Sequence, residues 1–339
     1  MNPIPAEVIL LDHGSGGQQS HQLLTDIIMP AFDNPMLSMM HDGAVCDIDG
    51  KRVAFSTDTF VVDPLFFPGG SIGDLAINGT VNDLAMCGAA PLYLSAGIVI
   101  EEGFPINDLK KVLEKMSEAA READVKVVTG DTKVVPKGAM DKIFINTAGI
   151  GLIPVHIDIS SNRARPGDKI IISGSIADHG MAILTQREGL KFDSPVLSDT
   201  APLHRMVADM LAVCPDIHVL RDPTRGGVAA VLNEIASKSV VGITIYEEKI
   251  PLQRGTAAIC ELLGFDPLYV ANEGKMIAFV PYDYADKVLA AMRADDLGKN
   301  ACIIGEAVND HSGKVVMQTR IRGTRIIDMP MGELLPRIC

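Results

Sequence analysis

Five aspartates are the first residues whose type and setting could do chemistry. They lie beside small residues or at the end of an expected element, and they are Asp42, Asp58, Asp83, Asp131 and Asp222. Carboxylates in such places can reach into a cleft, and Mg²⁺ binds a few carboxylate oxygens together with substrate phosphates and water. A single aspartate more often caps a helix or a turn. Five in similar settings favour a metal and phosphate site.

Two further residues have the charge that group transfer needs. Lys133 follows Asp131 closely and could offset charge on a transferring phosphoryl group. Glu273 stands just before an apolar run, where a partly desolvated carboxylate could act as a base. Each of the two, taken alone, is more typical of a surface position.

A glycine-rich loop, His13-Gly14-Ser15-Gly16-Gly17, precedes a helical pattern over residues 18–29. A loop that enters a helix offers free amides to a phosphate group. The loop is neither a P-loop nor a complete dinucleotide motif, so an ordinary turn fits the pattern equally well.

The chain ends in a thiol, because its last residue is Cys339. Pro330 and Pro336 argue against a regular helix or a central strand and predict an extended arm. Such an arm could carry a covalent group into one pocket and then another. Arg337 favours the thiolate and the α-carboxylate opposes it, so the sequence leaves the thiol pKa open. On position alone, a frayed end whose cysteine has no role is the better interpretation.

Composition excludes several classes of protein. A chain of 339 residues with 47% hydrophobic residues predicts two domains with substantial cores. A net charge of −13 and only 4% aromatic residues argue against a nucleic-acid partner. The six cysteines show neither a CxxC pair nor a zinc spacing, which favours a reducing, cytoplasmic setting. Without a signal-peptide pattern or a run long enough to span a bilayer, no membrane association is expected.

Alternating strand and helix patterns must position these residues. Strands are expected over 52–59, 92–100, 125–128, 143–152, 170–173, 240–246 and 276–280. Helices are expected over 71–90, closed by Pro91, over 105–122 with Leu109, Val112, Leu113 and Met116 on one face, over 178–188, over 202–213 and after 221–227.

An internal echo suggests two halves of similar α+β design. Residues 104–116 match residues 280–292 without a gap, and each helix leads into a strand expected to end in glycine plus an acid, at 130–131 and at 305–306. Chance remains an alternative, because the matched positions are common in helix cores. The predicted division is an N-terminal loop and helix over 1–38, an ATP-binding and dimerising domain over 39–155, a second domain over 165–327 and a mobile tail over 328–339.

Together the motifs closely resemble the HypE family, the carbamoyl dehydratases of nickel–iron hydrogenase maturation. The motifs that carry the resemblance are 13–17, 55–58, 63–70, 82–83, 130–133, 221–227, 272–275 and the terminal Pro336-Arg337-Ile338-Cys339. Single pieces recur in the wider ATP-binding superfamily of aminoimidazole ribonucleotide synthetase, selenophosphate synthetase and thiamine-monophosphate kinase. The fold implied is α+β, of the α/β sandwich type, with two aminoimidazole ribonucleotide synthetase-like domains and a flexible C-terminal tail.

The resemblance also implies a reaction, cofactors and partners. A carbamoyltransferase of the HypF type would deliver a carbamoyl group to the terminal thiol. ATP with Mg²⁺ would activate the carbamoyl oxygen, and loss of water would leave a thiocyanate. The cyano group would pass to iron on a scaffold of the HypC–HypD type. The protein itself would be a homodimer formed mainly through its N-terminal domains.

By position, the resemblance assigns roles to single residues. Cys339 would be the carrier, with Lys133 and Glu273 nearest the thiocarboxamide. The implied magnesium ligands are Asp42, Asp58, Asp83 and Asp222, with Asp131 as a further metal or phosphate contact. The implied nucleotide contacts are Gly14, Ser15, Gly16, Gly17, Thr57, Asn82, Asp131, Thr132 and Arg225.

Two other functions stay open at the level of sequence. A small-molecule ATP phosphotransferase, similar to selenophosphate synthetase or thiamine-monophosphate kinase, would keep its turnover after replacement of Cys339 by alanine. A non-catalytic nucleotide-binding scaffold, whose tail is only a docking peptide, would bind partners without cleaving ATP.

Overall fold

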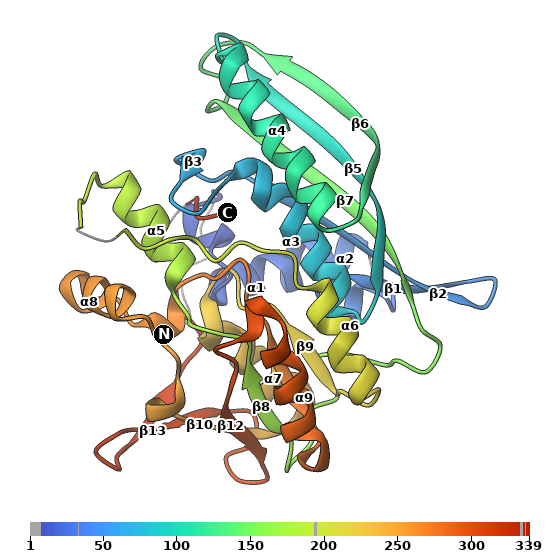
Figure 1. The fold of residues 1–339 in the computed structure, drawn as a ribbon, viewed down its shortest axis with the longest axis vertical. Coiled ribbons are helices and arrows are strands. Elements are labelled where there is room, and N and C mark those ends of the chain that lie inside the picture. Colours follow the sequence, from blue (N-terminus) through green and yellow to red (C-terminus); the bar gives the residue numbers. More distant parts are fainter. Residues whose placement is uncertain (1–7, 33, 193–194, 333–334, 336) are drawn as a thin grey trace.

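Two β-sheets organise the chain, one from each half (Figure 1). The computed structural model describes residues 8–32, 34–192, 195–332, 335 and 337–339. The mixed helix and sheet content confirms the α+β class that the sequence predicts. Among the described residues, no helix is both long and apolar enough to cross a membrane.

The N-terminal segment is helical after the glycine loop. The helix predicted over 18–29 is confirmed and continues to Ala31, with a π-helical turn in its middle. Its parts are α1 (Gln18–Leu23), the π-turn (Leu24–Ile28) and α2 (Met29–Ala31). Short 3₁₀ turns at Leu11–Gly14 and Leu37–Met39 flank this helical segment.

The first sheet has five strands in the order β1-β2-β7-β5-β6. They are β1 (Ala44–Ile48), β2 (Lys51–Phe60), β5 (Ala90–Glu101), β6 (Lys126–Val135) and β7 (Ile143–Ile153). Only β5 and β6 pair in parallel, and β6 forms an edge. The predicted strand over 125–128 therefore runs further than expected, so that the 130–133 motif lies inside β6 and not at its end.

Helix α3 (Ile72–Met86) packs through small residues, as the sequence predicts. Ser71 caps it by accepting a hydrogen bond from the Gly73 amide at 3.1 Å. A Cβ on Gly73 would come within 2.4 Å of the Val112 carbonyl oxygen of the neighbouring helix, so only glycine permits this approach.

The expected end of this helix was wrong. Gly88 adopts φ 75° and ends α3 early, as a left-handed glycine after a last turn commonly does. Pro91 instead lies inside β5, next to an irregularity in the pairing with β7. A short hairpin, β3 (Phe66–Phe67) and β4 (Gly70–Ser71), leads into α3.

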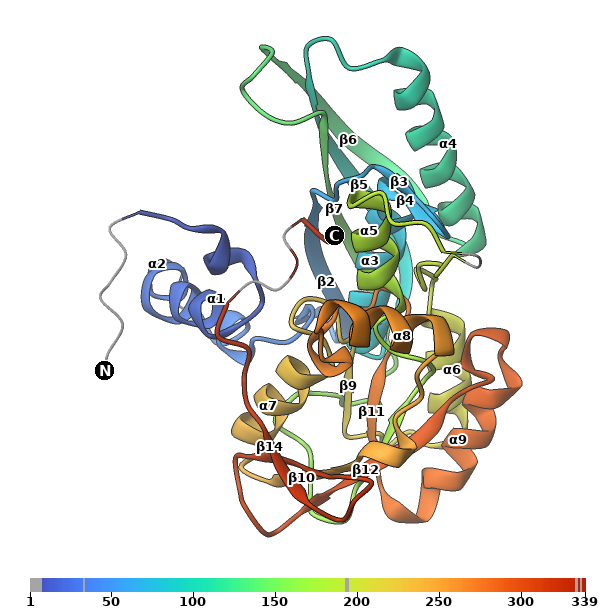
Figure 2. The same cartoon turned by 90° about the vertical axis from the view of Figure 1, so that its left-hand side faces the viewer.

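Helix α4 (Ile106–Glu122) confirms the amphipathic prediction in most positions. Val112 and Met116 are buried, and Leu109 packs against the same core. Leu113, expected on that face, is 42% exposed. The buried face of α4 is the one that packs against α3, and Leu113 lies at the edge of that face. Helices α3 and α4 cover the same face of the first sheet, whose other face is left open (Figure 2).

The second sheet has seven strands in the order β14-β13-β10-β12-β8-β11-β9. They are β8 (Lys169–Ile172), β9 (Val219–Arg221), β10 (Gly242–Tyr246), β11 (Ile277–Val280), β12 (Cys302–Val308), β13 (Val315–Gln318) and β14 (Thr324–Ile327). The helices of this half are α5 (Asp178–Arg187), α6 (His204–Val213), α7 (Gly227–Ser239), α8 (Arg254–Leu263) and α9 (Ala285–Ala294). Short 3₁₀ turns stand at Glu247–Lys249, Pro267–Tyr269, Tyr282–Tyr284 and Asp296–Gly298.

The internal echo corresponds to two strand–helix–strand units, β5-α4-β6 and β11-α9-β12. In the first unit the two strands are neighbours. In the second unit β8 lies between them, antiparallel to both. The second acid-bearing pair, 305–306, lies inside β12 and not at its end. One apolar core reaches from α3 to α6 and β9, so the two halves are packed together.

Candidate active site

Three carboxylates meet where the two halves join. Asp58 comes from β2, Asp83 from α3, and Asp222 from the loop between β9 and α7. Burial, followed by the charges of Asp222 and Asp58, holds the pKa of Asp83 well above its ordinary value. Burial and the Asp58 charge also raise the pKa of Asp222 to about 6. Asp83 keeps one partner, the Ser56 hydroxyl, which donates to it at 2.6 Å.

Asp42 joins this cluster but has a cation of its own. Arg221 lies 2.5 Å from Asp42 through Nε and 2.9 Å from Glu234 through Nη1. Burial still raises the pKa of Asp42, and its second oxygen has no hydrogen-bond partner among the described residues. Lys238 lies nearby, and burial lowers its pKa to about 8. Asp42 is thus the acid of the cluster that the protein itself neutralises.

The donor set fits a hard divalent cation. No group of three or more His, Cys, Asp or Glu side chains in the described part of the chain forms a ready-made metal cage. Mg²⁺ needs only one or two carboxylates, because phosphates and water complete its shell. Asp58, Asp83 and Asp222 offer oxygen donors whose mutual repulsion a cation would relieve.

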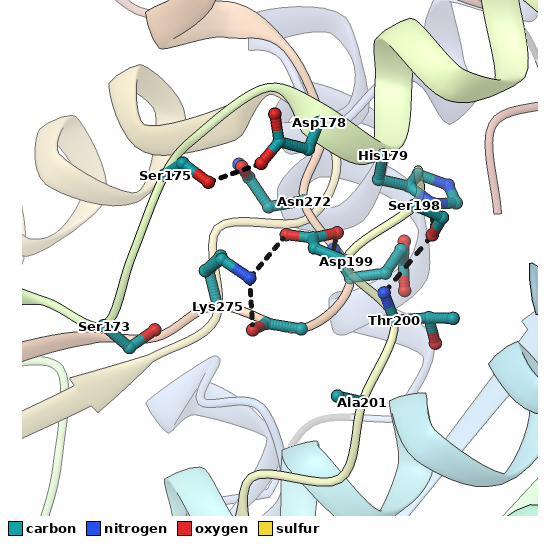
Figure 3. Close-up of polar contacts among 12 residues, drawn as sticks. Ser173, Ser175, Asp178, His179, Ser198, Asp199, Thr200, Ala201, Asn272 and Lys275 are labelled. Carbon is teal, nitrogen blue, oxygen red and sulfur yellow. Dashed lines mark hydrogen bonds and ion pairs between the residues drawn. The ribbon is translucent and has the colours of Figure 1, made fainter. Parts of the chain in front are cut away.

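Glu273 faces the same cluster from the loop before β11. It is 4% exposed, and its Oε1 has no hydrogen-bond partner among the described residues. Burial first, and then Asp58, Asp222 and Asp199, hold its pKa well above the ordinary value. Its amide donates to Asp199 at 3.0 Å, and Lys275 lies 3.3 Å from Asp199 (Figure 3).

Asn82, an expected nucleotide contact, bonds backbone groups of the second half through its side chain. Its side chain is fully buried, and its amide donates to the carbonyls of Ala201 and Glu273. Its oxygen accepts from the Leu203 amide at 2.8 Å. These three backbone bonds leave it holding the Glu273 segment in place, whereas the neighbouring Asp83 faces the acids.

The described part of the tail returns to this cluster. The tail runs antiparallel to the residues after β2, with the Val61 amide donating to the Cys339 carbonyl at 2.9 Å and the Asp63 amide to that of Arg337 at 3.2 Å. Ile338 is buried, and Figure 2 shows the C-terminus between β2 and α5. Pro336, one of the prolines that predicted an extended arm, lies outside the described residues, as do 333 and 334.

The charges of the site shift the pKa of the terminal thiol. Burial raises the pKa of Cys339, and Glu273, Asp58 and Asp222 raise it further, while Arg225 opposes them. Arg225 has its own pKa raised, with Cys339 as the first cause. A cavity of about 210 Å³ lies beside the thiol, and its walls include Ser15, Thr59 and Arg225.

The glycine loop closes one wall of this cavity. A Cβ on Gly16, which adopts φ 75°, would lie 2.8 Å from the Arg225 Cβ. The amides expected to be free are bonded: Gly16 donates to Ser20 Oγ, Gly17 to Ser15 Oγ, and Gln18 to the Pro330 carbonyl. Gly14 contributes its carbonyl, which accepts from Arg225 at 3.3 Å.

Asp131, Thr132 and Lys133 are not brought to the cluster within one chain. They lie on the edge strand β6, where Asp131 and Lys133 pair with each other at 2.8 Å and are each 68% exposed in their side chains. Across the sheet, Asp131 stands in register with Gly97, and through β7 with Thr59 beside the cavity. Three strand spacings separate Asp131 from Thr59, roughly 14 Å.

Thr57 lies on the same open face of the sheet. Its hydroxyl donates to the Thr147 carbonyl at 3.2 Å and accepts from the Asn146 amide group. Sequence reasoning missed several residues around the tail and the base: Arg187, Ser198, Asp199 and His179. Only the polar run at 198–200 carried a signal, and a polar loop is too common to be specific.

The fold and its acid cluster define a class, the AIR synthase related proteins. The N-terminal domain of that family matches residues 40–153, and its C-terminal domain matches residues 165–318. A structure of ThiL with AMPPCP and TMP shares the fold, with a TM-score of 0.72 at 18% identity over 91% of this chain and 95% of that one.

Closer relatives narrow the class to one family. The carbamoyl dehydratase HypE of Rhizobium leguminosarum bv. viciae is 54% identical over 97% of this chain and 94% of its own length, and HypE of Escherichia coli K12 is 46% identical over 98% and 99%. A HypE structure in complex with ATP has a TM-score of 0.83 at 50% identity over 98% of this chain and all of that one. A HypE–HypF complex gives 0.87 at 50% identity over 91% and 99%. The chain belongs to the HypE carbamoyl dehydratase family.

Proposed function

We propose that this chain dehydrates a carbamoyl group carried on the sulfur of its own Cys339, at the expense of ATP. The product would be a thiocyanate whose cyano group goes to iron in nickel–iron hydrogenase maturation. The observation that carries this proposal is the return of the terminal thiol to Glu273, Arg225 and the acids. Relatives named carbamoyl dehydratase and a HypE structure with ATP support it.

The reaction balances as thiocarboxamide plus ATP giving thiocyanate, ADP and phosphate. The carbamoyl oxygen bonds to the γ-phosphorus, and the later break of its bond to carbon releases that oxygen as part of phosphate. Nitrogen loses two protons, one as the O-phosphorylated intermediate forms and one as phosphate departs. Glu273 is the proposed base, because its carboxylate is desolvated and has an unpartnered oxygen.

The proposed metal ligands are Asp58, Asp83 and Asp222, with Asp42 beside them. Bound Mg²⁺ would supply charge neutralisation for the phosphoryl oxygens. Arg225 would hold negative charge at the cavity, next to the loop residues Gly14, Ser15, Gly16 and Gly17. Nucleotide contacts through the loop amides would require those amides to exchange their present partners.

A homodimer would account for the exposed apolar face of the first sheet. Phe55, Ile150 and Tyr93 stand side by side across three strands, and are 48%, 39% and 45% exposed. A second copy seated on this face would cover them. Asp131 and Lys133, on the same sheet, would then lie at the interface, where their proposed metal, phosphate and thiocarboxamide roles could be met.

The remaining partners follow from the reaction. Carbamoyl delivery requires a carbamoyltransferase of the HypF type, which the solved HypE–HypF complex of a relative supports. Cyanide transfer requires an iron scaffold of the HypC–HypD type. A thiol chemistry of this kind suits the reducing cytoplasm.

The test is the mass of the C-terminal peptide. Carbamoylated protein given ATP and Mg²⁺ should lose the mass of one water at that peptide, and a Cys339→Ala variant should neither accept carbamoyl nor show ATP turnover that depends on it. An unchanged peptide mass, or undiminished ATP turnover in Cys339→Ala, would favour the small-molecule phosphotransferase.

A further inference from the structure

A buried histidine in the second half of the chain forms a hydrogen bond to the tail. His179, near the start of α5, is fully buried, and its Nε2 lies 2.7 Å from the Ile338 carbonyl oxygen. A carbonyl can only accept, so Nε2 must carry the hydrogen. The thiol-bearing residue is the next one along the chain.

The protonation of the other ring nitrogen, Nδ1, is set by a short chain of hydrogen bonds. In a neutral ring, Nδ1 is then an acceptor, and the Ser198 hydroxyl donates to it at 2.8 Å. The Thr200 amide in turn donates to the Ser198 oxygen at 3.2 Å. Burial lowers the pKa of His179, which keeps the ring neutral and this tautomer in place. Figure 3 shows the ring beside Ser198, next to the loop that carries Asp199.

The hairpin motif 63–70, whose purpose the reaction does not explain, supports this arrangement. The Phe67 ring meets the His179 ring edge to face, with centroids 5.6 Å apart. The Pro68 carbonyl accepts from the Ser198 amide at 2.8 Å. A Cβ on Gly69 would lie 2.7 Å from the Ser198 nitrogen, so the hairpin can approach only as glycine.

We propose that His179 is a positioning residue for the tail: its Nε2–H clasps the Ile338 carbonyl and so sets where the Cys339 sulfur stands. Because the bond goes to backbone, it does not depend on what the sulfur carries. The same segment, 198–200, bonds Glu273 through Asp199. The clasp therefore places thiol and base against one common support. Its value for catalysis rests on the proposed function, but the clasp itself does not.

The test is the rate at which iodoacetamide alkylates Cys339 in the free protein, followed by the mass of the C-terminal peptide. His179→Ala should speed alkylation roughly tenfold, because the buried carbonyl loses its donor. His179→Gln, which keeps an amide donor, should restore the rate to within about threefold of wild type. His204→Ala is the matched control, since this histidine starts a different helix and its Nδ1 has no hydrogen-bond partner among the described residues; the alkylation rate of this variant should equal that of wild type.

A wild-type alkylation rate in a folded His179→Ala protein would overturn the clasp, as would a Gln variant that reacts as fast as the Ala variant. Should His179→Ala not fold, Ser198→Ala removes the donor to Nδ1, together with the acceptor of the Thr200 amide, and should speed alkylation roughly threefold; no change would likewise overturn the clasp. Neither ATP nor carbamoyl enters this measurement. If His179→Ala is alkylated faster but the separate peptide-mass test shows no dehydration even in wild type, the clasp is upheld and the proposed function is contradicted.

Discussion

The acid cluster at the residue scale holds more negative charge than its surroundings neutralise. Arg221 balances Asp42 and Glu234 directly. Arg225 lowers the pKa of Asp58 and Arg221 that of Asp222, but no ion pair between these acids and an arginine is present among the described residues. Sites that hold such repulsion in the free protein gain most when a cation binds. Function and stability therefore conflict at these positions.

Asp83→Asn should separate the contribution of Asp83 to function from its effect on stability. The variant removes a carboxyl group whose ionised form is disfavoured by burial and by Asp222 and Asp58, and it keeps an oxygen for the Ser56 hydroxyl. It should stabilise the metal-free protein by about 1 kcal/mol, or ~2–4 °C in Tm. The same change should abolish ATP hydrolysis. Thermal melts and phosphate release measure the two effects. A less stable variant that still hydrolyses ATP would contradict both roles.

Glu273 gives a pH dependence. Its folded pKa lies above its ordinary 4.5, so between these values the folded state keeps a proton that the unfolded state has lost. Stability therefore falls as pH rises through this window. Glu273→Gln removes that loss, so its gain in Tm over wild type should be larger at pH 8 than at pH 4. Equal gains would argue against a strained carboxylate.

Glu273→Gln or Glu273→Ala should leave nucleotide binding largely intact while it blocks dehydration. In the wild type, dehydration should rise with pH as Glu273 ionises. Retained dehydration in the alanine variant would remove Glu273 from the mechanism.

Two glycines make a matched pair at the element scale. Gly16 and Gly50 both adopt φ 75°, but a Cβ on Gly16 would strike Arg225 while one on Gly50 meets nothing within 4 Å. Both alanine variants should lose about 1–2 kcal/mol from backbone strain. Only Gly16→Ala should also weaken nucleotide binding, because it pushes the loop away from Arg225. Nucleotide titration checks this, and equal affinities in the two variants would contradict a role for the loop.

Sequence patterns predicted the elements better than their ends. The small residues of α3 correctly indicated close packing, and the amphipathic stripe of α4 was correct except at Leu113. The end of α3 was misplaced because Pro91 is a strong signal in sequence, while the effect of Gly88 depends on its left-handed backbone. The 130–133 motif was expected after its strand, although pairing with β5 continues β6 through it.

The sequence predicted which residues form the site better than it predicted the contacts that those residues make. Asp58, Asp83, Asp222, Glu273 and Cys339 do come together, across both halves of the chain. Neither the contact of His179 with the tail nor the backbone bonds of Asn82 were predicted from sequence, because both involve backbone groups of distant segments. Such contacts leave no spacing pattern behind.

The whole molecule is expected to function as a pair. Ile150→Asp would place a charge in the centre of the exposed apolar row on the first sheet and should convert a dimer to monomers with an unchanged melt. Leu262→Asp is the control, because this residue is 70% exposed on α8, away from that sheet. Light scattering gives the mass. A monomeric wild type, or a dimeric Ile150→Asp, would contradict the proposed interface.

The central claim is that the protein acts on its own last residue. The direct measurement uses protein whose Cys339 carries a carbamoyl group labelled with ¹⁸O, mixed with ATP and Mg²⁺. The peptide mass should fall by the mass of one labelled water, while the ¹⁸O itself should appear in inorganic phosphate, one label for each thiocyanate formed. Phosphate without label, or a labelled peptide of unchanged mass beside continuing ATP hydrolysis, would contradict the account.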